Sequence, residues 1–221
     1  MSPDSLSALR LSLEVAVSAT ALNALVGIPI AYVLARRRFW GQSLVDLLVT
    51  LPLILPPTVV GYYLIVLLGR RGLLGAPLYQ ATGFTVAFTW YAAVIAATVM
   101  ALPLLVRTAR AAIESVDRDL ERAAYTLGRS ELSTVLQVTL PLARNGILAG
   151  LVLSFARALG EFGATLMLAG NIPGRTTTVP LSIYTAMQTG EDSEALVLVA
   201  VLTALSCVVL IATNRLVARS A

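Results

Sequence analysis

The amino-acid sequence predicts an all-α membrane protein with about five transmembrane helices. Of its 221 residues, 57% are hydrophobic and only 13% are charged, which is too apolar for a soluble domain of this size. The apolar residues gather in five runs, each close to the roughly 20 residues that a helix needs to cross a bilayer. We therefore interpret residues 1–221 as a single transmembrane domain in contact with membrane lipid.

The runs and the arginines between them predict how the chain is oriented. The runs cover residues 9–35, 44–68, 84–106, 147–168 and 195–216. All 16 basic residues are arginines, and alternate connecting segments are rich in them. The opposite set of segments holds only Arg10, Arg70, Arg71 and Arg175. Because positive residues are retained on the cytoplasmic side, we expect a multi-pass protein of the cytoplasmic membrane with its N-terminus outside and its C-terminus inside.

Several functional classes do not fit the residue types present. The chain has no histidine and one cysteine, Cys207, so neither a Cys/His metal site nor a disulfide framework is expected. It has no phosphate-binding glycine loop, so we expect no ATP hydrolysis and no cofactor in this chain. The net charge of +4 follows the loops of a membrane protein, which argues against a nucleic-acid partner. We expect no catalytic residues and no metal.

The second run contains LPLILPPTVVGYY, in which prolines interrupt the helix. Proline removes a backbone hydrogen bond, and such breaks persist in membranes where protein or water satisfies the freed groups. One interpretation is a broken helix beside a translocation path, with Pro56, Pro57 and Thr58 at the path or gate and Tyr62 as a further lining residue. The alternative is a kink that only helps the bundle to pack.

Residues 116–141 form the one long polar segment between the runs. Apolar residues recur there at helical spacing, and charged residues take the opposite face: Val116, Leu120, Ala123, Ala124 and Leu127 against Asp117, Arg118, Asp119, Glu121 and Arg122. Asp117 is a suitable N-cap, Gly128 suits a left-handed C-terminal turn, and Ser130 can cap a second helix that runs to Pro141. The pattern predicts a short amphipathic helix that either meets a soluble partner or is an ordinary surface helix.

The fourth run carries Arg157 and Glu161, which are four residues apart and therefore neighbours on a helix. Each charge inside a bilayer costs at least about 2.5 kcal/mol, so the two need an explanation. One interpretation is that the two charges neutralise each other, or pair with another helix, and lock the bundle. The other is that Arg157 faces a path and Glu161 tempers its attraction for an anion. Gly146 and Gly150, also four apart, predict the close approach of another helix.

The segment ERAAYTLG, followed by Val138 and then Leu140 and Pro141, resembles the EAA loop of ABC importer permeases. In that family the loop is the coupling helix that inserts into the ATP-binding subunit. The resemblance implies that the following residues meet an ABC ATPase: Glu121, Ala123, Ala124, Leu127, Gly128 and Pro141. Arg122 stands where the family usually has an acidic residue, and Val138 stands where isoleucine is frequent, so the finer contacts with the ATPase stay open.

Two further stretches, LPPTVVGYY and FARALGEFGATLMLAGNIPGRTTTVPLSIY, resemble permeases that import molybdate and tungstate and, less closely, sulfate and thiosulfate. The short chain also favours the molybdate type. The resemblance implies a type I ABC importer permease fold, two permease copies with two ATPases that hold ATP and magnesium, and an external oxyanion-binding protein. It also implies an outer gate and a docking face for that protein in the segment 171–192, which begins at Asn171. The alternative for this segment is a solvated loop with an interfacial helix.

Other functions remain open at this point. A sulfate or thiosulfate permease would share the same architecture. An ion-driven secondary transporter usually shows internal repeats and more ionisable residues within its spans. A membrane scaffold would need neither the broken second run nor the charges at 157 and 161. Binding of an ATPase through residues 116–141 would separate an importer from these last two classes.

Overall fold

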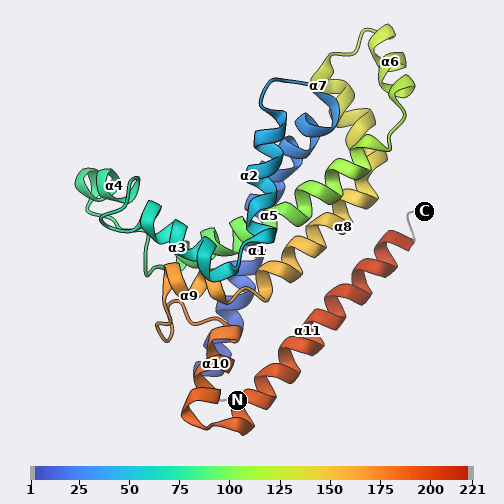
Figure 1. Cartoon of the computed structure of the whole chain (residues 1–221). Coiled ribbons are helices and arrows are strands. Elements are labelled where there is room, and N and C mark those ends of the chain that lie inside the picture. Colours follow the sequence, from blue (N-terminus) through green and yellow to red (C-terminus); the bar gives the residue numbers. More distant parts are fainter. Residues whose placement is uncertain (1–2, 219–221) are drawn as a thin grey trace.

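The computed structural model describes the backbone of residues 3–218 and the side chains of residues 4–211, and within that range it contains helices and no strand. Three long helices form the centre of the molecule: α1 (Pro3–Arg36), α5 (Trp90–Glu114) and α8 (Leu140–Leu159). Figure 1 shows them crossing side by side, with α11 (Asp192–Ala218) along one flank. The all-α prediction is confirmed.

Small residues let the central helices approach closely. A Cβ atom on Gly146 would lie 2.3 Å from the Cβ of Ala112, and one on Gly150 would lie 3.1 Å from Leu105 Cδ1. The face of α5 toward α1 and α8 is largely alanine, and several of these side chains are fully buried: Ala92, Ala93, Ala96, Ala97 and Ala101. The predicted close packing along the fourth run is therefore confirmed, with α5 as the partner helix.

The second run is broken where its prolines predict. It forms α2 (Gln42–Ile54) and α3 (Pro57–Leu68), whose axes are bent by 120° across Leu55 and Pro56. Pro57 occupies the first turn of α3, where its missing N–H is not needed. The break is larger than a kink, because α3 turns away from α2 and continues into α4 (Gly75–Thr82) at the edge of the molecule (Figure 1).

The predicted bounds of the fourth run are wrong at both ends. The helix begins well before residue 147, because α7 (Glu131–Thr134) continues through a π-helical stretch (Val135–Thr139) into α8 without a stop at Pro141. It ends at Leu159 rather than at residue 168, and a new short helix, α9 (Gly163–Ala169), follows. An apolar composition alone did not reveal this break, since neither side of it is polar enough to interrupt the pattern.

Among the residues that the structure describes, four helices are long and apolar enough to cross a membrane, and the bent pair α2 and α3 is a fifth if its two halves make one span. The four are Asp4–Arg36, Trp90–Glu114, Glu131–Leu159 and Asp192–Ile211. The short helix α6 (Arg118–Thr126) lies at one end of the bundle, and α10 (Val179–Thr189) lies at the other, beside the start of α1 (Figure 1). The segments 116–141 and 171–192 therefore occupy opposite ends, as the sequence predicts.

Candidate coupling segment and translocation path

The segment 116–141 folds as helix, glycine turn and helix. Asp117 Oδ1 accepts a hydrogen bond of 2.9 Å from the N–H of Asp119, which caps the start of α6. At the other end Gly128 has a φ of 79°, and its N–H donates to the carbonyl of Tyr125 while the N–H of Arg129 donates to that of Ala124. This pair of bonds is a Schellman motif, which needs a left-handed residue at Gly128. The predicted caps are confirmed.

A second helix follows directly. Ser130 Oγ accepts from the N–H of Ser133 at 3.3 Å, as expected for the cap of α7. From there the helix runs through Pro141, which lies in the first turn of α8 and breaks no bond of that element. The candidate coupling segment, residues 116–141, is therefore continuous with the central helix α8.

The apolar face of α6 and its flanking residues is partly buried against the bundle and partly exposed. Val116 and Ala124 are buried against the bundle. Leu120 and Leu127 are 49% and 83% exposed, and Leu132 on α7 is 69% exposed. Apolar side chains that project from a short helix at the end of a protein suit the groove of a partner. This geometry matches the chemistry expected of a docking element.

Glu121 is the residue that the amphipathic pattern misplaced. The pattern put it on the exposed charged face, but it is only 8% exposed. Its carboxylate forms an ion pair of 3.1 Å with Arg36 and accepts a hydrogen bond of 2.7 Å from the hydroxyl of Thr139. Arg36 also donates to the carbonyl of Val116 at 2.9 Å. Pairing and hydrogen bonding offset the free-energy cost of burying the two charges. The pair also links α6 to α1.

Sequence reasoning missed Arg36 and Thr139 as partners of this carboxylate. Arg36 lies 85 residues before Glu121, and its position at the end of an apolar run was explained by membrane orientation alone. Thr139 lies inside a helix with no polar neighbours that would mark it. The one local signal is that Thr139 is a polar residue at a position where the helical spacing predicts a buried side chain.

A second ion pair at this end joins α1 to α7. Arg37 pairs with Glu131, which also accepts a hydrogen bond of 3.4 Å from the hydroxyl of Tyr32. The hydrogen bond to Glu131 and its negative charge raise the pKa of Arg37, so the guanidinium stays charged. Both side chains are about half exposed, so this contact is much weaker than the buried one.

The predicted path residues of the second and fourth runs come together. A Cβ atom on Gly163, at the start of α9, would lie 3.0 Å from Pro57 Cβ and 3.3 Å from Thr58 Cγ2. A Cβ atom on Gly61 would lie 2.7 Å from Met167 Cβ. The two broken helices therefore meet along α3 and α9, which Figure 1 shows beside the central bundle.

The two charges of the fourth run lie at this junction. Arg157 Nη1 is 2.7 Å from Glu161 Oε2, and the side chains are 26% and 2% exposed, respectively. Glu161 lies beyond the end of α8, and its other oxygen accepts a hydrogen bond of 2.8 Å from the N–H of Ala164. Glu161 thus caps α9 and pairs with Arg157, while Arg157 keeps part of its surface open.

Asn171 lies apart from this junction. Its side-chain amide donates to Thr185 Oγ1 at 2.8 Å, and its carbonyl oxygen accepts from Thr177 Oγ1 at 2.7 Å. These bonds tie the loop at Asn171 to α10, beside a polar hollow that Asp4 and Glu191 also line. The structure does not bring Asn171 together with Arg157 and Glu161.

Comparison with known sequences identifies the family. Residues 27–221 match the profile of the family described as "Binding-protein-dependent transport system inner membrane component". The chain belongs to this permease family. Among curated relatives, the permease is 48% identical over 189 residues to "Molybdenum transport system permease protein ModB" of Haemophilus influenzae, covering 86% of this chain and 82% of that one. It is 50% identical over 190 residues to the protein of the same name from Escherichia coli K12, covering 85% and 83%.

Solved structures confirm the fold. The permease superimposes on a chain of the MetNI methionine ABC transporter with a TM-score of 0.75 at 17% identity, with full coverage of both chains. It superimposes on a chain of a bacterial ABC transporter for alginate import with a TM-score of 0.74 at 18% identity, over 99% of this chain and 80% of the other. The fold is that of a type I ABC importer permease.

Proposed function

We propose that this permease is the membrane subunit of an ATP-driven importer that carries molybdate, or the closely similar tungstate, into the cell. The observation that carries the proposal is the near 50% identity to molybdenum transport permeases over most of both chains. The protein of the same name from Azotobacter vinelandii is 40% identical over 200 residues. None of these names supports the alternative of a sulfate or thiosulfate permease, which becomes an outcome of the test.

The partners follow from the ends of the molecule. At one end, the exposed side chains of Leu120 and Leu127 dock on an ABC ATPase, which binds ATP and magnesium and hydrolyses the nucleotide. At the other end, α10 and the loop at Asn171 meet an external oxyanion-binding protein. The N-terminus then lies outside and the C-terminus in the cytoplasm. Two copies of this single transmembrane domain enclose the path between them.

The transport cycle uses the ion pair and the continuous helix described above. Closure of the ATPases moves α6, and the buried contact between Glu121 and Arg36 passes this movement to α1 while the continuous helix passes it to α8. The bundle then rocks as a rigid body. The breaks before α3 and before α9 are adjacent, and they are the hinges at which these two short helices change direction. At that junction Pro56, Pro57 and Thr58 face the path together with Arg157. Arg157 attracts the anion, and its pairing with Glu161 keeps that attraction weak enough for release.

The test is reconstitution of the permease in lipid vesicles with its ATPase and its binding protein. We expect molybdate or tungstate to stimulate ATP hydrolysis several-fold over the rate without anion, and sulfate to have no effect. Stimulation by sulfate alone would retain the importer and refute the substrate. Failure of the permease to bind any ATPase through α6 would refute the importer itself and favour an ion-driven transporter or a scaffold. A variant with Leu120→Ala and Leu127→Ala provides the matched control for docking.

A further inference from the structure

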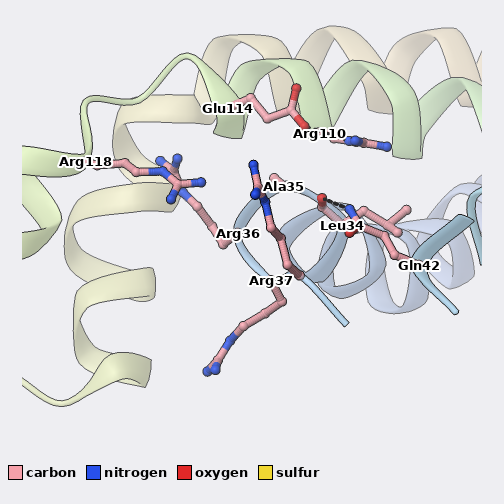
Figure 2. A pocket seen from close by; sticks show the side chains of 9 residues that line it. Leu34, Ala35, Arg36, Arg37, Gln42, Arg110, Glu114 and Arg118 are labelled. Carbon is pink, nitrogen blue, oxygen red and sulfur yellow. Dashed lines mark hydrogen bonds and ion pairs between the residues drawn. The ribbon is translucent and has the colours of Figure 1, made fainter. Parts of the chain in front are cut away.

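A cavity of about 610 Å³ opens at the end of the bundle that carries α6. Its lining comes from the end of α1, the start of α2, the end of α5 and the start of α6, as Figure 2 shows. Six of the lining side chains are charged, and only one of them is acidic: Arg36, Arg37, Arg38, Arg110, Arg118 and Glu114. The cavity therefore has a strongly positive wall.

Most of these charges already have partners. Arg36 binds Glu121, Arg37 binds Glu131, and Arg110 holds Glu114 at 2.7 Å and Asp46 at 3.2 Å. The side chains of Arg38 and Arg118 make no hydrogen bond or ion pair within residues 4–211. Each guanidinium carries five donors in a planar fork that fits the oxygens of a phosphate. The cavity therefore has two guanidinium groups without an acidic partner in the described residues, and these could bind an anion from outside the protein.

The surroundings place this cavity at the level of lipid headgroups. At 1.5 Å per residue α1 is about 51 Å long, which exceeds the hydrocarbon core of about 30 Å, so the helix is long enough for its charged end at Arg36 to lie outside that core. The turn that follows exposes Phe39 and Trp40, at 39% and 102%. Exposed aromatic residues beside arginines are typical of the membrane interface. On α2, directly after this turn, Leu44 and Leu48 are 58% and 59% exposed.

The start of α2 adds a weaker attraction for an anion. Its N-cap is Gly41, which offers no side chain, and the N–H groups of Gln42 and Leu44 already donate to the carbonyls of Phe39 and Gly41. The partial positive charge of a 13-residue helix at its N-terminus favours a phosphate there. Gln42, the first residue of α2, lines the same cavity and is held by a hydrogen bond of 3.0 Å to the carbonyl of Leu34 (Figure 2).

We propose that this cavity binds the phosphate group of an anionic phospholipid of the adjoining leaflet. Arg38 and Arg118 donate to the phosphate oxygens, and Phe39 and Trp40 lie against the glycerol and the first methylene groups of the same lipid. Arg118 is the first residue of α6, so the bound lipid holds the start of the docking helix at the membrane surface. This site is separate from the path at Arg157.

The test uses the full chain in detergent, titrated with phosphatidylglycerol or phosphatidylcholine and followed by native mass spectrometry. We expect phosphatidylglycerol to bind at least tenfold more tightly than phosphatidylcholine. The double variant Arg38→Gln and Arg118→Gln removes this preference. The matched control, Arg129→Gln and Arg144→Gln, removes the same charge from exposed arginines outside the cavity and keeps the preference.

Further arms of the experiment separate the occupants. Retention of phosphatidylglycerol in millimolar inorganic phosphate supports a lipid, whereas full displacement would assign the cavity to a soluble anion and overturn the proposal. Loss of the lipid when the ATPase is added would assign the cavity to the docked protein instead. An equal loss of preference in both double variants would show attraction by net charge alone. The double variant Arg38→Lys and Arg118→Lys keeps the charge, and we expect it to fold and to retain part of the preference.

Discussion

Two arginine–glutamate pairs lie inside this permease, and they differ in what they join. Arg36 and Glu121 connect α1 to α6 across 85 positions of sequence, and their side chains are 7% and 11% exposed. Arg157 and Glu161 are four residues apart, and Arg157 is 26% exposed. The long-range pair can be satisfied only when two elements are docked. The local pair is satisfied within one turn and leaves Arg157 partly exposed. The first pair therefore joins two elements, whereas only the second has the open charge that the proposed transport role needs.

The largest effect is expected from Glu121→Ala. This change leaves Arg36 buried without its partner charge, which typically costs about 3 kcal/mol. We expect a clear fall in the unfolding midpoint of the purified permease and loss of ATPase co-purification. The double variant Arg36→Met and Glu121→Leu removes both charges and should recover most of the thermal stability without restoring coupling. A stability loss as large in the double variant as in the single one would contradict the role of the pair.

A smaller structural effect and a larger functional one are expected from Glu161→Gln. The amide oxygen still accepts from the N–H of Ala164, and Arg157 retains access to water, so we expect a loss of stability of about 1 kcal/mol. Arg157 without its counter-charge should hold the anion longer and slow the maximal uptake several-fold. Uptake in reconstituted vesicles measures this. Unchanged uptake kinetics would reduce the pair to a structural lock.

The smallest effect is expected from Glu131→Gln, which removes the exposed pair with Arg37. The side chains are 57% and 46% exposed, and water and salt screen an exposed pair of this kind, so it contributes little to stability. The unfolding midpoint should stay within error of the parent protein at physiological salt. A fall as large as that of Glu121→Ala would show that exposure does not separate the two contacts between α1 and the coupling segment.

Local chemistry made much of the coupling segment predictable. The caps at Asp117 and Ser130 and the left-handed turn at Gly128 depend on hydrogen bonds between residues a few positions apart, so their spacing is visible in the sequence. The break at Pro56 and Pro57 was predictable for the same reason, because proline acts on its own helix. The end of α8 at Leu159 was not, since no proline marks it and the turn depends on Glu161 bonding forward to Ala164.

The sequence by itself determined the helical class, the amphipathic helix after Asp117 and the adjacency of Arg157 and Glu161 along the chain. Hydrophobic periodicity, helix capping and the length of an apolar run each depend on residues within a single helix, so they can be recognised from neighbouring positions in the sequence. The tertiary structure alone decided that Glu121 turns inward to Arg36, that α3 meets α9, and that arginines from four elements share one cavity. These contacts join residues far apart in the chain, and their geometry follows from how the helices pack rather than from any one helix.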